Sequence, residues 1–211
     1  KPQSAGVLFD GVAGNPLEEH VEAGHAAYAA AGAQAVVAVG GGSAMDVAKV
    51  VAMRVNHRRP LGDYDEYKGG DKLVNGEVPP IVAIPTTAGT GSEVGRAGVV
   101  TLRETNRKTV IFAPKLLPCA AILDPELTAS MPAHITAATG YDALTHCVEA
   151  LVATHDHPLS AAIAVGGIKL VAKSLERAVR AGSDLEARGD MLKAAAMGAI
   201  LITMLLAFLR A

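Results

Sequence analysis

Residues 33–49 read AQAVVAVGGGSAMDVAK, and this stretch decides the fold class of the chain. The short apolar run at 33–39 is rich in β-branched residues and predicts a buried strand. The glycines at 40–42 end that strand, and residues 44–53 have the composition of a helix. A glycine turn between a strand and a helix lets a ligand approach the backbone, and the free N–H groups of the helix start attract phosphate. The alternative is a tight turn in which Ser43 only caps the helix.

The segments on either side continue an alternation of helices and strands. Residues 17–31 predict an amphipathic helix with two acidic residues in its first turn. Further apolar runs predict a buried strand, a hairpin around a polar turn, and one more short strand, at residues 81–84, 98–102 with 109–112, and 120–123. Helices alternating with apolar strands are typical of a parallel sheet covered on both faces.

A second loop follows the strand at 81–84 and reads PTTAGTGSEV over residues 85–94. We call residues 86–94 the threonine loop and residues 40–42 the glycine turn. Open α/β sheets bind ligands in a crevice at the carboxyl ends of their strands. We therefore expect four hydroxyls of this loop to face that crevice: those of Thr86, Thr87, Thr90 and Ser92. They are suited to phosphate and ribose oxygens, with Gly89 and Gly91 letting the backbone come close. The alternative is a solvated, hydroxyl-rich turn.

After Pro125 the strand pattern stops, and three segments are helical in period or composition: 136–153, 159–179 and 185–209. We therefore expect two domains, an α/β domain over residues 1–129 and an all-helical domain over residues 130–211. The predicted fold class is α/β, a Rossmann-like parallel-sheet nucleotide-binding domain followed by an all-α domain.

The composition narrows the classes of function. Half of the 211 residues are hydrophobic and the formal net charge is −2, so we expect a folded core and no electrostatic surface for nucleic acid or an anionic membrane. The expected partner is a small molecule. The two cysteines, Cys119 and Cys147, do not make a disulfide framework, and the first six residues show no signal-peptide pattern. We therefore expect a reducing, cytoplasmic location.

Asp142 and His146 lie four residues apart in a predicted helix, so both side chains project from one face. A carboxylate oxygen and an imidazole nitrogen at this spacing suit a divalent ion, which needs at least two more ligands. The alternative is structural, with Asp142 capping a helix that starts after Gly140. His155 and His157 are candidate further ligands or members of a polar turn. The remaining histidines are expected in exposed positions without a functional role: His20, His25, His57 and His134.

Four long motifs, taken together and in this order, resemble the iron-containing (group III) alcohol dehydrogenases. They are GGGSAMDVAK at 40–49, PTTAGTGSEV at 85–94, DPELT at 124–128 and TAATGYDALTH at 136–146. The likeness extends from about Phe9 to about Ala199. It implies an α/β dinucleotide-binding domain, an all-helical domain and an active site in the cleft between them.

The resemblance also implies roles for individual residues. Gly41, Gly42 and Ser43 would hold the cofactor pyrophosphate, and Asp46 would belong to the same cofactor site. Phosphate and ribose on the nicotinamide side would be bound by Thr86, Thr87 and Thr90, and Lys108 would lie near the same cofactor. Asp142 and His146 would be metal ligands and so catalytic. The implied cofactors are NAD or NADP and a divalent metal, iron first and zinc second.

The implied reaction is hydride transfer between a primary or secondary alcohol and NAD(P), with the metal polarising the alcohol oxygen. Two other functions stay open: a truncated nucleotide-binding protein without catalysis, and a metal-free reductase of the same fold, against which Asp142 and His146 argue. Gly95 and Ala113 depart from the family's common Thr and Asp, and the first departure removes one cofactor hydroxyl. Family members are also longer at both ends, and their other two metal-ligand histidines lie in the C-terminal part.

The run at 200–209 is almost wholly apolar where the family is more polar. Only sixteen residues separate Lys193 from Arg210, which at 1.5 Å per residue spans about 24 Å and falls short of a bilayer. We therefore expect a core helix rather than a membrane anchor. An exposed apolar helix favours self-association, so we expect a homo-oligomer.

Overall fold

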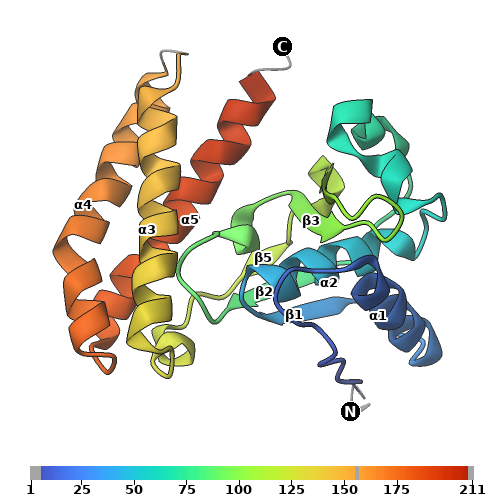
Figure 1. Ribbon diagram of the computed structural model, residues 1–211, viewed down its shortest axis with the longest axis horizontal. Helices are drawn as coiled ribbons and strands as arrows, with labels where there is room; N and C mark the ends of the chain where they lie inside the picture. The colour runs from blue at the N-terminus through green and yellow to red at the C-terminus, as the bar shows by residue number, and fades with distance from the viewer. Residues whose placement is uncertain (1–5, 155–156, 209–211) are drawn as a thin grey trace. The chain divides into compact units, whose positions relative to one another are not determined.

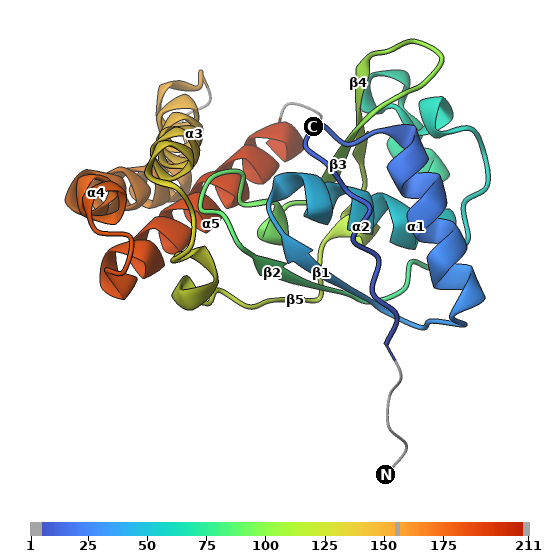
Figure 2. The same ribbon diagram turned by 60° about the horizontal axis from the view of Figure 1, so that its bottom comes forward.

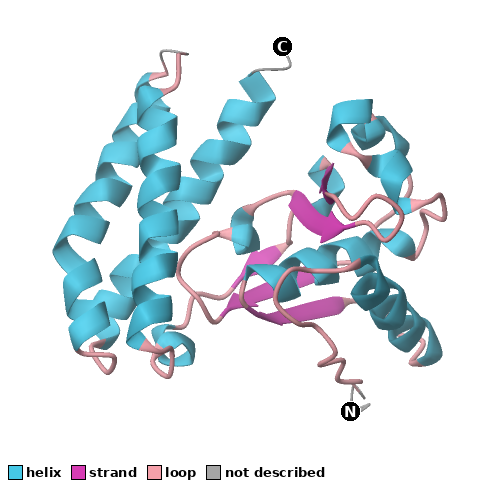
Figure 3. Ribbon diagram, in the orientation of Figure 1, coloured by secondary structure: helices cyan, strands magenta, loops and turns pink. Residues whose placement is uncertain are grey.

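The computed structural model describes residues 6–154 and 157–208, with side chains described up to residue 203. Every helix and strand expected from the sequence is present (Figures 1 and 3). In chain order the elements are α1 (Glu18–Ala30), β1 (Val36–Gly40), α2 (Gly42–Arg54), β2 (Ile81–Pro85), β3 (Ala97–Thr101), β4 (Lys108–Phe112), β5 (Ala120–Ala121), α3 (Ala133–Val152), α4 (Pro158–Arg180) and α5 (Leu185–Phe208).

The chain forms two compact units, and each unit is built from three separate stretches of the chain. The first unit holds residues 1–39, 43–83 and 96–120, and the second holds residues 40–42, 84–95 and 121–211. The glycine turn and the threonine loop therefore belong to the same unit as α3, α4 and α5. The domain boundary expected between residues 129 and 130 stays a prediction.

Strands β1, β2 and β5 form one sheet in the order β1-β2-β5. The Val36 N–H donates to Pro80 O at the start of the pair, and the Thr86 N–H donates to Gly40 O at its end, so β1 and β2 run parallel. Helix α2 packs on one face, where Met45 contacts Ala38 and Ala83 (Figure 2). The expected cover on both faces is wrong for β1 in this chain, because Val37 and Val39 are 62% and 55% exposed.

The predicted hairpin is confirmed as the antiparallel pair β3 and β4, with Ala97 opposite Phe112 and Thr101 opposite Lys108. It packs in the core of the first unit, where Val100 and Ile111 contribute side chains with no exposed surface. Gly98 lets the hairpin approach α2 closely, since a Cβ built there would lie 2.7 Å from a methyl group of Val50.

Between α2 and β2 the chain forms three short 3₁₀ helices, Leu61–Tyr64, Glu66–Lys68 and Gly70–Leu73. Tyr64 is buried in this segment, and His57, which precedes it, is 4% exposed. The expectation that His57 is exposed is therefore wrong. Its ring contacts the Tyr64 ring edge-on, with 6.2 Å between ring centroids.

In the second unit α3, α4 and α5 lie side by side (Figures 1 and 2). Glycines bring the helices together: a Cβ on Gly140 of α3 would lie 2.2 Å from a methyl group of Leu175, and one on Gly167 of α4 would lie 2.5 Å from Cys147 Sγ. Among the described residues, α4 is the helix whose length and apolar composition would allow it to cross a bilayer. Its face toward the other helices is buried.

The apolar run predicted as a core helix at 200–209 is the last part of α5, which ends at Phe208. Leu201 in this run is buried. The side chains from residue 204 onward, and the whole of Leu209, lie outside the described part of the chain.

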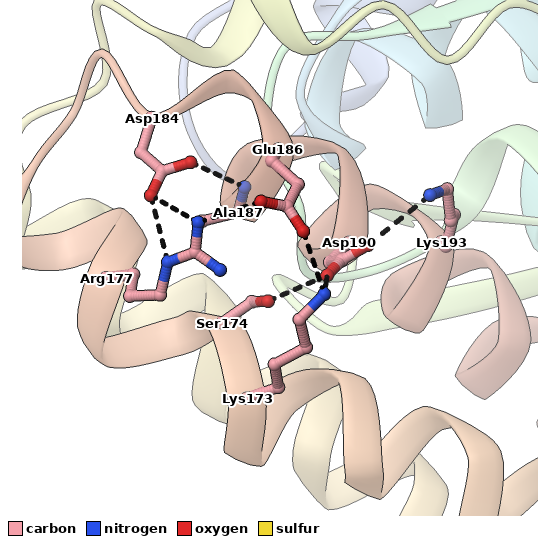
Figure 4. A network of polar contacts seen from close by, with 8 residues as sticks. All are labelled: Lys173, Ser174, Arg177, Asp184, Glu186, Ala187, Asp190 and Lys193. Carbon is pink, nitrogen blue, oxygen red and sulfur yellow. Dashed lines mark hydrogen bonds and ion pairs between the residues drawn. The ribbon is translucent and has the colours of Figure 1, made fainter.

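A network of charged side chains joins α4 to α5 (Figure 4). Asp190, 5% exposed, accepts hydrogen bonds from Lys173 Nζ and Ser174 Oγ, each at 2.9 Å. Arg177 pairs with Asp184 at 2.8 Å and with Glu186 at 3.0 Å. The hydrogen bond from Lys173, helped by Ser174, lowers the pKa of Asp190 against the opposing effect of burial. We call Lys173, Ser174, Arg177, Asp184, Glu186, Asp190 and Lys193 the α4–α5 network.

Candidate functional site

The glycine turn and the threonine loop interlock in the second unit. A Cβ built on Gly41 would lie 3.2 Å from Thr87 Cγ2, and one on Gly42 would lie 2.8 Å from Thr90 Cγ2 and 3.0 Å from its Oγ1. The space that a side chain would take at the turn is thus filled by two threonines. Their hydroxyls lie next to the N-terminus of α2, which begins at Gly42. Hydroxyl donors beside free helix N–H groups suit an anionic oxygen such as phosphate.

The threonine loop is inserted among the helices and is not a solvated turn. Its Ala88 is 5% exposed and packs in the core formed by α3, α4 and α5. Gly89 abuts α3, where a Cβ would lie 2.9 Å from Thr139 Cβ, and Gly91, with φ of +60°, abuts Ala195 O of α5. These two glycines therefore let the loop pack closely against α3 and α5. The sequence had instead predicted that they make room for a ligand.

The other predicted cofactor residues lie as follows. Ser43 is inside the first turn of α2, so the capping alternative is wrong, since the helix already begins at Gly42. Asp46 of α2 accepts a hydrogen bond from the Val99 N–H at 3.2 Å and so ties α2 to β3. Lys108 is exposed at the start of β4.

Ser92 in the threonine loop is 9% exposed, so its hydroxyl does not have the open crevice position that the sequence predicted. Its N–H donates to Thr90 Oγ1 at 3.2 Å.

The predicted pair in α3 is brought together. His146 Nε2 lies 3.7 Å from Asp142 Oδ1, and the side chains are 23% and 43% exposed. Because α3 begins at Ala133, Asp142 lies in the middle of the helix, and the alternative in which it caps the helix is wrong. The other ring nitrogen, His146 Nδ1, is buried and has no hydrogen-bond partner.

A metal ion at this pair needs further ligands. In residues 6–154 and 157–208, no three His, Cys, Asp or Glu side chains come together as a metal site. His157 caps α4, with its Nδ1 accepting from the Ser160 N–H at 3.2 Å, and His155 lies outside the described residues. Burial raises the pKa of the Cys147 thiol, which is next to His146 in the chain.

Asp142 and His146 fit a divalent ion as two of its ligands. The oxygen donor and the nitrogen donor lie 3.7 Å apart on one helix, and both side chains are partly exposed. They supply part of a coordination shell, because a protein-bound ion of this kind takes four or more donors.

The described residues thus contain a parallel α/β sheet, a glycine turn at the start of α2, and three packed helices that carry a carboxylate–imidazole pair. Comparison with protein families then gives the family. A model described as iron-containing alcohol dehydrogenase matches residues 2–125, and one for the C-terminal part of the same family matches residues 136–208. The chain belongs to the iron-containing alcohol dehydrogenase family.

Individual relatives agree with this assignment. A 4-hydroxybutyrate dehydrogenase of Cupriavidus necator is 41% identical over 193 residues, covering 92% of this chain and 50% of the relative. The crystal structure of a 1,3-propanediol oxidoreductase matches with a TM-score of 0.88 at 40% identity, covering 93% of this chain and 50% of the other. A sulfoacetaldehyde reductase from Bifidobacterium kashiwanohense, solved in complex with NAD+, matches with a TM-score of 0.83 at 36% identity, covering 93% and 51%. The chain thus spans about half the length of these relatives.

Proposed function

We propose that this chain is the nucleotide-binding and metal-ligating half of an alcohol dehydrogenase that transfers hydride between a primary or secondary alcohol and NAD(P). One observation carries the proposal. The interlocked glycine turn and threonine loop, and the Asp142–His146 pair, belong to one compact unit. Relatives named for alcohols and diols, and one solved with NAD+, support the substrate and cofactor classes.

In this proposal the cofactor is bound mainly by backbone and hydroxyl groups. Gly41, Gly42 and Ser43 hold the pyrophosphate at the start of α2, where the helix dipole favours negative charge. The hydroxyls of Thr86, Thr87 and Thr90 donate to phosphate and ribose oxygens.

Two further side chains belong to the proposed cofactor site. Asp46 fixes α2 against β3 through the Val99 N–H, and Lys108 contributes positive charge toward the cofactor. When bound, NAD(P) supplies the hydride acceptor at its nicotinamide ring.

Asp142 and His146 are proposed to hold a divalent ion, iron first and zinc as the alternative. Such an ion acts as a Lewis acid toward the alcohol oxygen. The carboxylate of Asp142 supplies negative charge, and the imidazole of His146 supplies a nitrogen donor through Nε2, which faces Asp142. Both side chains are carried by one rigid helix, so their separation is set by the backbone of α3.

A second candidate function is nucleotide binding without catalysis by this chain alone. Two observations favour it: the chain spans about half of its relatives, and the described residues bring no third metal-binding side chain to Asp142 and His146. Under this alternative, activity belongs to a longer protein of which this is a part.

The test combines a binding titration with an anaerobic assay. The 211-residue chain is titrated with NADH and NADPH, and is then supplied with ferrous ion, oxidised cofactor and primary alcohols. Turnover that a chelator abolishes supports the dehydrogenase, whereas cofactor binding without turnover supports the second candidate. A chain that binds neither cofactor contradicts both.

Two substitutions test cofactor binding and metal binding separately. Thr90→Val removes one phosphate donor and is expected to weaken NADH binding about ten-fold, the loss of one hydrogen bond to a charged group. Thr145→Val, an exposed threonine of α3 whose hydroxyl donates to Tyr141 O, is the matched control and should bind normally. His146→Ala is expected to lose metal retention while binding NADH as before; loss of both together refutes the division of roles.

The location and assembly of the protein are proposed on simpler grounds. Both cysteines are free, which fits a reducing compartment such as the cytoplasm. Exposed apolar side chains on the helical unit, among them Val152 and Leu159, support the proposal of a homo-oligomer.

A further inference from the structure

Gly198 of α5 lies directly against His146 of α3. A Cβ built on Gly198 would lie 2.9 Å from His146 Cβ, 3.3 Å from Ala143 O and 3.6 Å from Cys147 Sγ. The Cβ of His146 is fixed to the α3 backbone and cannot rotate away. Since carbon atoms pack at about 3.5–4.0 Å, any side chain at position 198 forces α3 and α5 apart or displaces His146.

Among the described residues, the His146 ring has no hydrogen bond at Nδ1 that would fix its orientation. A metal-ligating histidine usually donates its second N–H to a carboxylate or carbonyl, and that hydrogen bond fixes the ring. In the described part of the chain, His146 Nδ1 is buried and has no such partner. What holds the ring is then the surface it packs on, and Gly198 forms that surface at the Cβ.

We propose that Gly198 is a positioning residue for His146, holding it by close packing at the angle from which its Nε2 and Asp142 Oδ1 converge on a divalent ion. The inference rests on the proposed function for the role of the ion. It goes beyond that function in assigning to α5, which carries neither of the two proposed ligands, the task of aiming one of them.

The experiment compares three glycine-to-alanine variants of the whole chain. Gly198→Ala crowds His146. Gly189→Ala lies on the same helix, where the new methyl group meets only Pro125 at 3.9 Å. Gly167→Ala crowds Cys147 Sγ at 2.5 Å and so strains the contact between α3 and α4 without touching His146. Each chain is followed by the ¹H–¹³C NMR signals of the His146 ring, first without metal and then with added Co²⁺ alone.

We expect the metal-free His146 signals to shift in Gly198→Ala and to stay in place in both controls. Co²⁺ should broaden the wild-type His146 signals, and its affinity should fall roughly ten-fold to a hundred-fold in Gly198→Ala, the usual effect of removing the support of a ligand. Gly167→Ala should lower the melting temperature while keeping the wild-type affinity for Co²⁺.

The inference is overturned if Gly198→Ala leaves the His146 signals and the Co²⁺ affinity unchanged, or if Gly167→Ala weakens Co²⁺ binding as much. Failure of the proposed function looks different. If Co²⁺ does not reach His146 in the wild-type chain, the metal role of Asp142 and His146 is wrong, and the metal-free signals of Gly198→Ala still decide whether Gly198 orients the ring.

Discussion

His57 is a buried histidine whose two ring nitrogens both form hydrogen bonds. Nε2 accepts from the Gly76 N–H at 3.0 Å, so Nδ1 must carry the ring proton and donate it to Met53 O at 2.9 Å. The ring thereby joins the end of α2 to the segment before β2. This role is not visible in the sequence, because a histidine in a polar stretch before Arg58 and Arg59 resembles a surface residue.

We expect His57→Ala to lower the free energy of unfolding by about 1–3 kcal/mol, because the partly buried Gly76 N–H loses its acceptor, while Met53 O keeps its backbone donors. His57→Gln keeps an acceptor that reaches Gly76 and should recover part of the loss. Denaturant unfolding measures the stability, and hydrogen exchange at the Gly76 amide reports the contact itself. Wild-type exchange at Gly76 in His57→Ala would contradict this role.

Arg188 is a second residue whose role is structural, and it is 2% exposed. Its guanidinium donates to three neutral acceptors: Gly182 O at 3.0 Å, Thr136 Oγ1 at 2.8 Å and Met131 O at 3.3 Å. Burial lowers its pKa, but a guanidinium stays charged at neutral pH. It joins the start of α3 to the turn between α4 and α5.

Arg188→Lys should therefore cost about 2–4 kcal/mol of stability, because an ammonium group cannot reach three acceptors that are arranged for a planar fork. Arg180→Lys is the control, since Arg180 pairs with Glu176 in an exposed salt bridge and should change stability by less than about 1 kcal/mol. Thermal unfolding of both variants provides the measurement. Equal effects of the two substitutions would show that burial of Arg188 is unimportant.

At the scale of elements, the α4–α5 network lies beside an apolar core to which α4 contributes Val171 and α5 contributes Met191 and Leu192. The folded-state pKa of Asp190 is lowered, first by the hydrogen bond from Lys173. A lowered carboxylate pKa stabilises the fold above the unfolded value near 4 and loses that contribution as the pH falls through the folded value. The network therefore stabilises the helical unit against unfolding at neutral pH, and this stabilisation is lost in acid.

We predict that the wild-type chain loses stability as the pH falls from about 5 toward 2, with a shallower loss in Asp190→Asn. At neutral pH this variant should be about 2 kcal/mol less stable, because Lys173 and Ser174 lose a charged acceptor. Glu176→Gln, in the exposed pair with Arg180, should follow the wild-type pH profile. Urea unfolding at several pH values gives both comparisons, and parallel profiles for wild type and Asp190→Asn would disprove the assignment.

At the scale of the whole molecule, the sequence predicted the regular elements well. Helices α1 to α5 and strands β1 to β5 follow from apolar period and from glycine and proline boundaries. The Asp142–His146 pair followed from helical spacing alone. These features depend on local sequence, which is what periodicity measures.

What the sequence did not predict depends on contacts between distant segments. The 3₁₀ helices at 61–73 have no period of their own, and they form where Gly70 packs against the backbone of Tyr64. The burial of the threonine loop depends on Thr139 and Ala195, which lie far along the chain. In the sequence, a glycine that lets a ligand approach the backbone cannot be distinguished from a glycine that lets a helix pack closely.

The two free cysteines differ in a way that makes the chain convenient to label. Cys119 is exposed beside β5, whereas Cys147 is buried and its raised pKa keeps the reactive thiolate scarce. A maleimide dye at neutral pH should therefore attach to one position, as mass spectrometry of tryptic peptides can verify. A fluorophore at Cys119 would sit directly before β5 without any engineered mutation, and would give single-molecule experiments a fixed reference point.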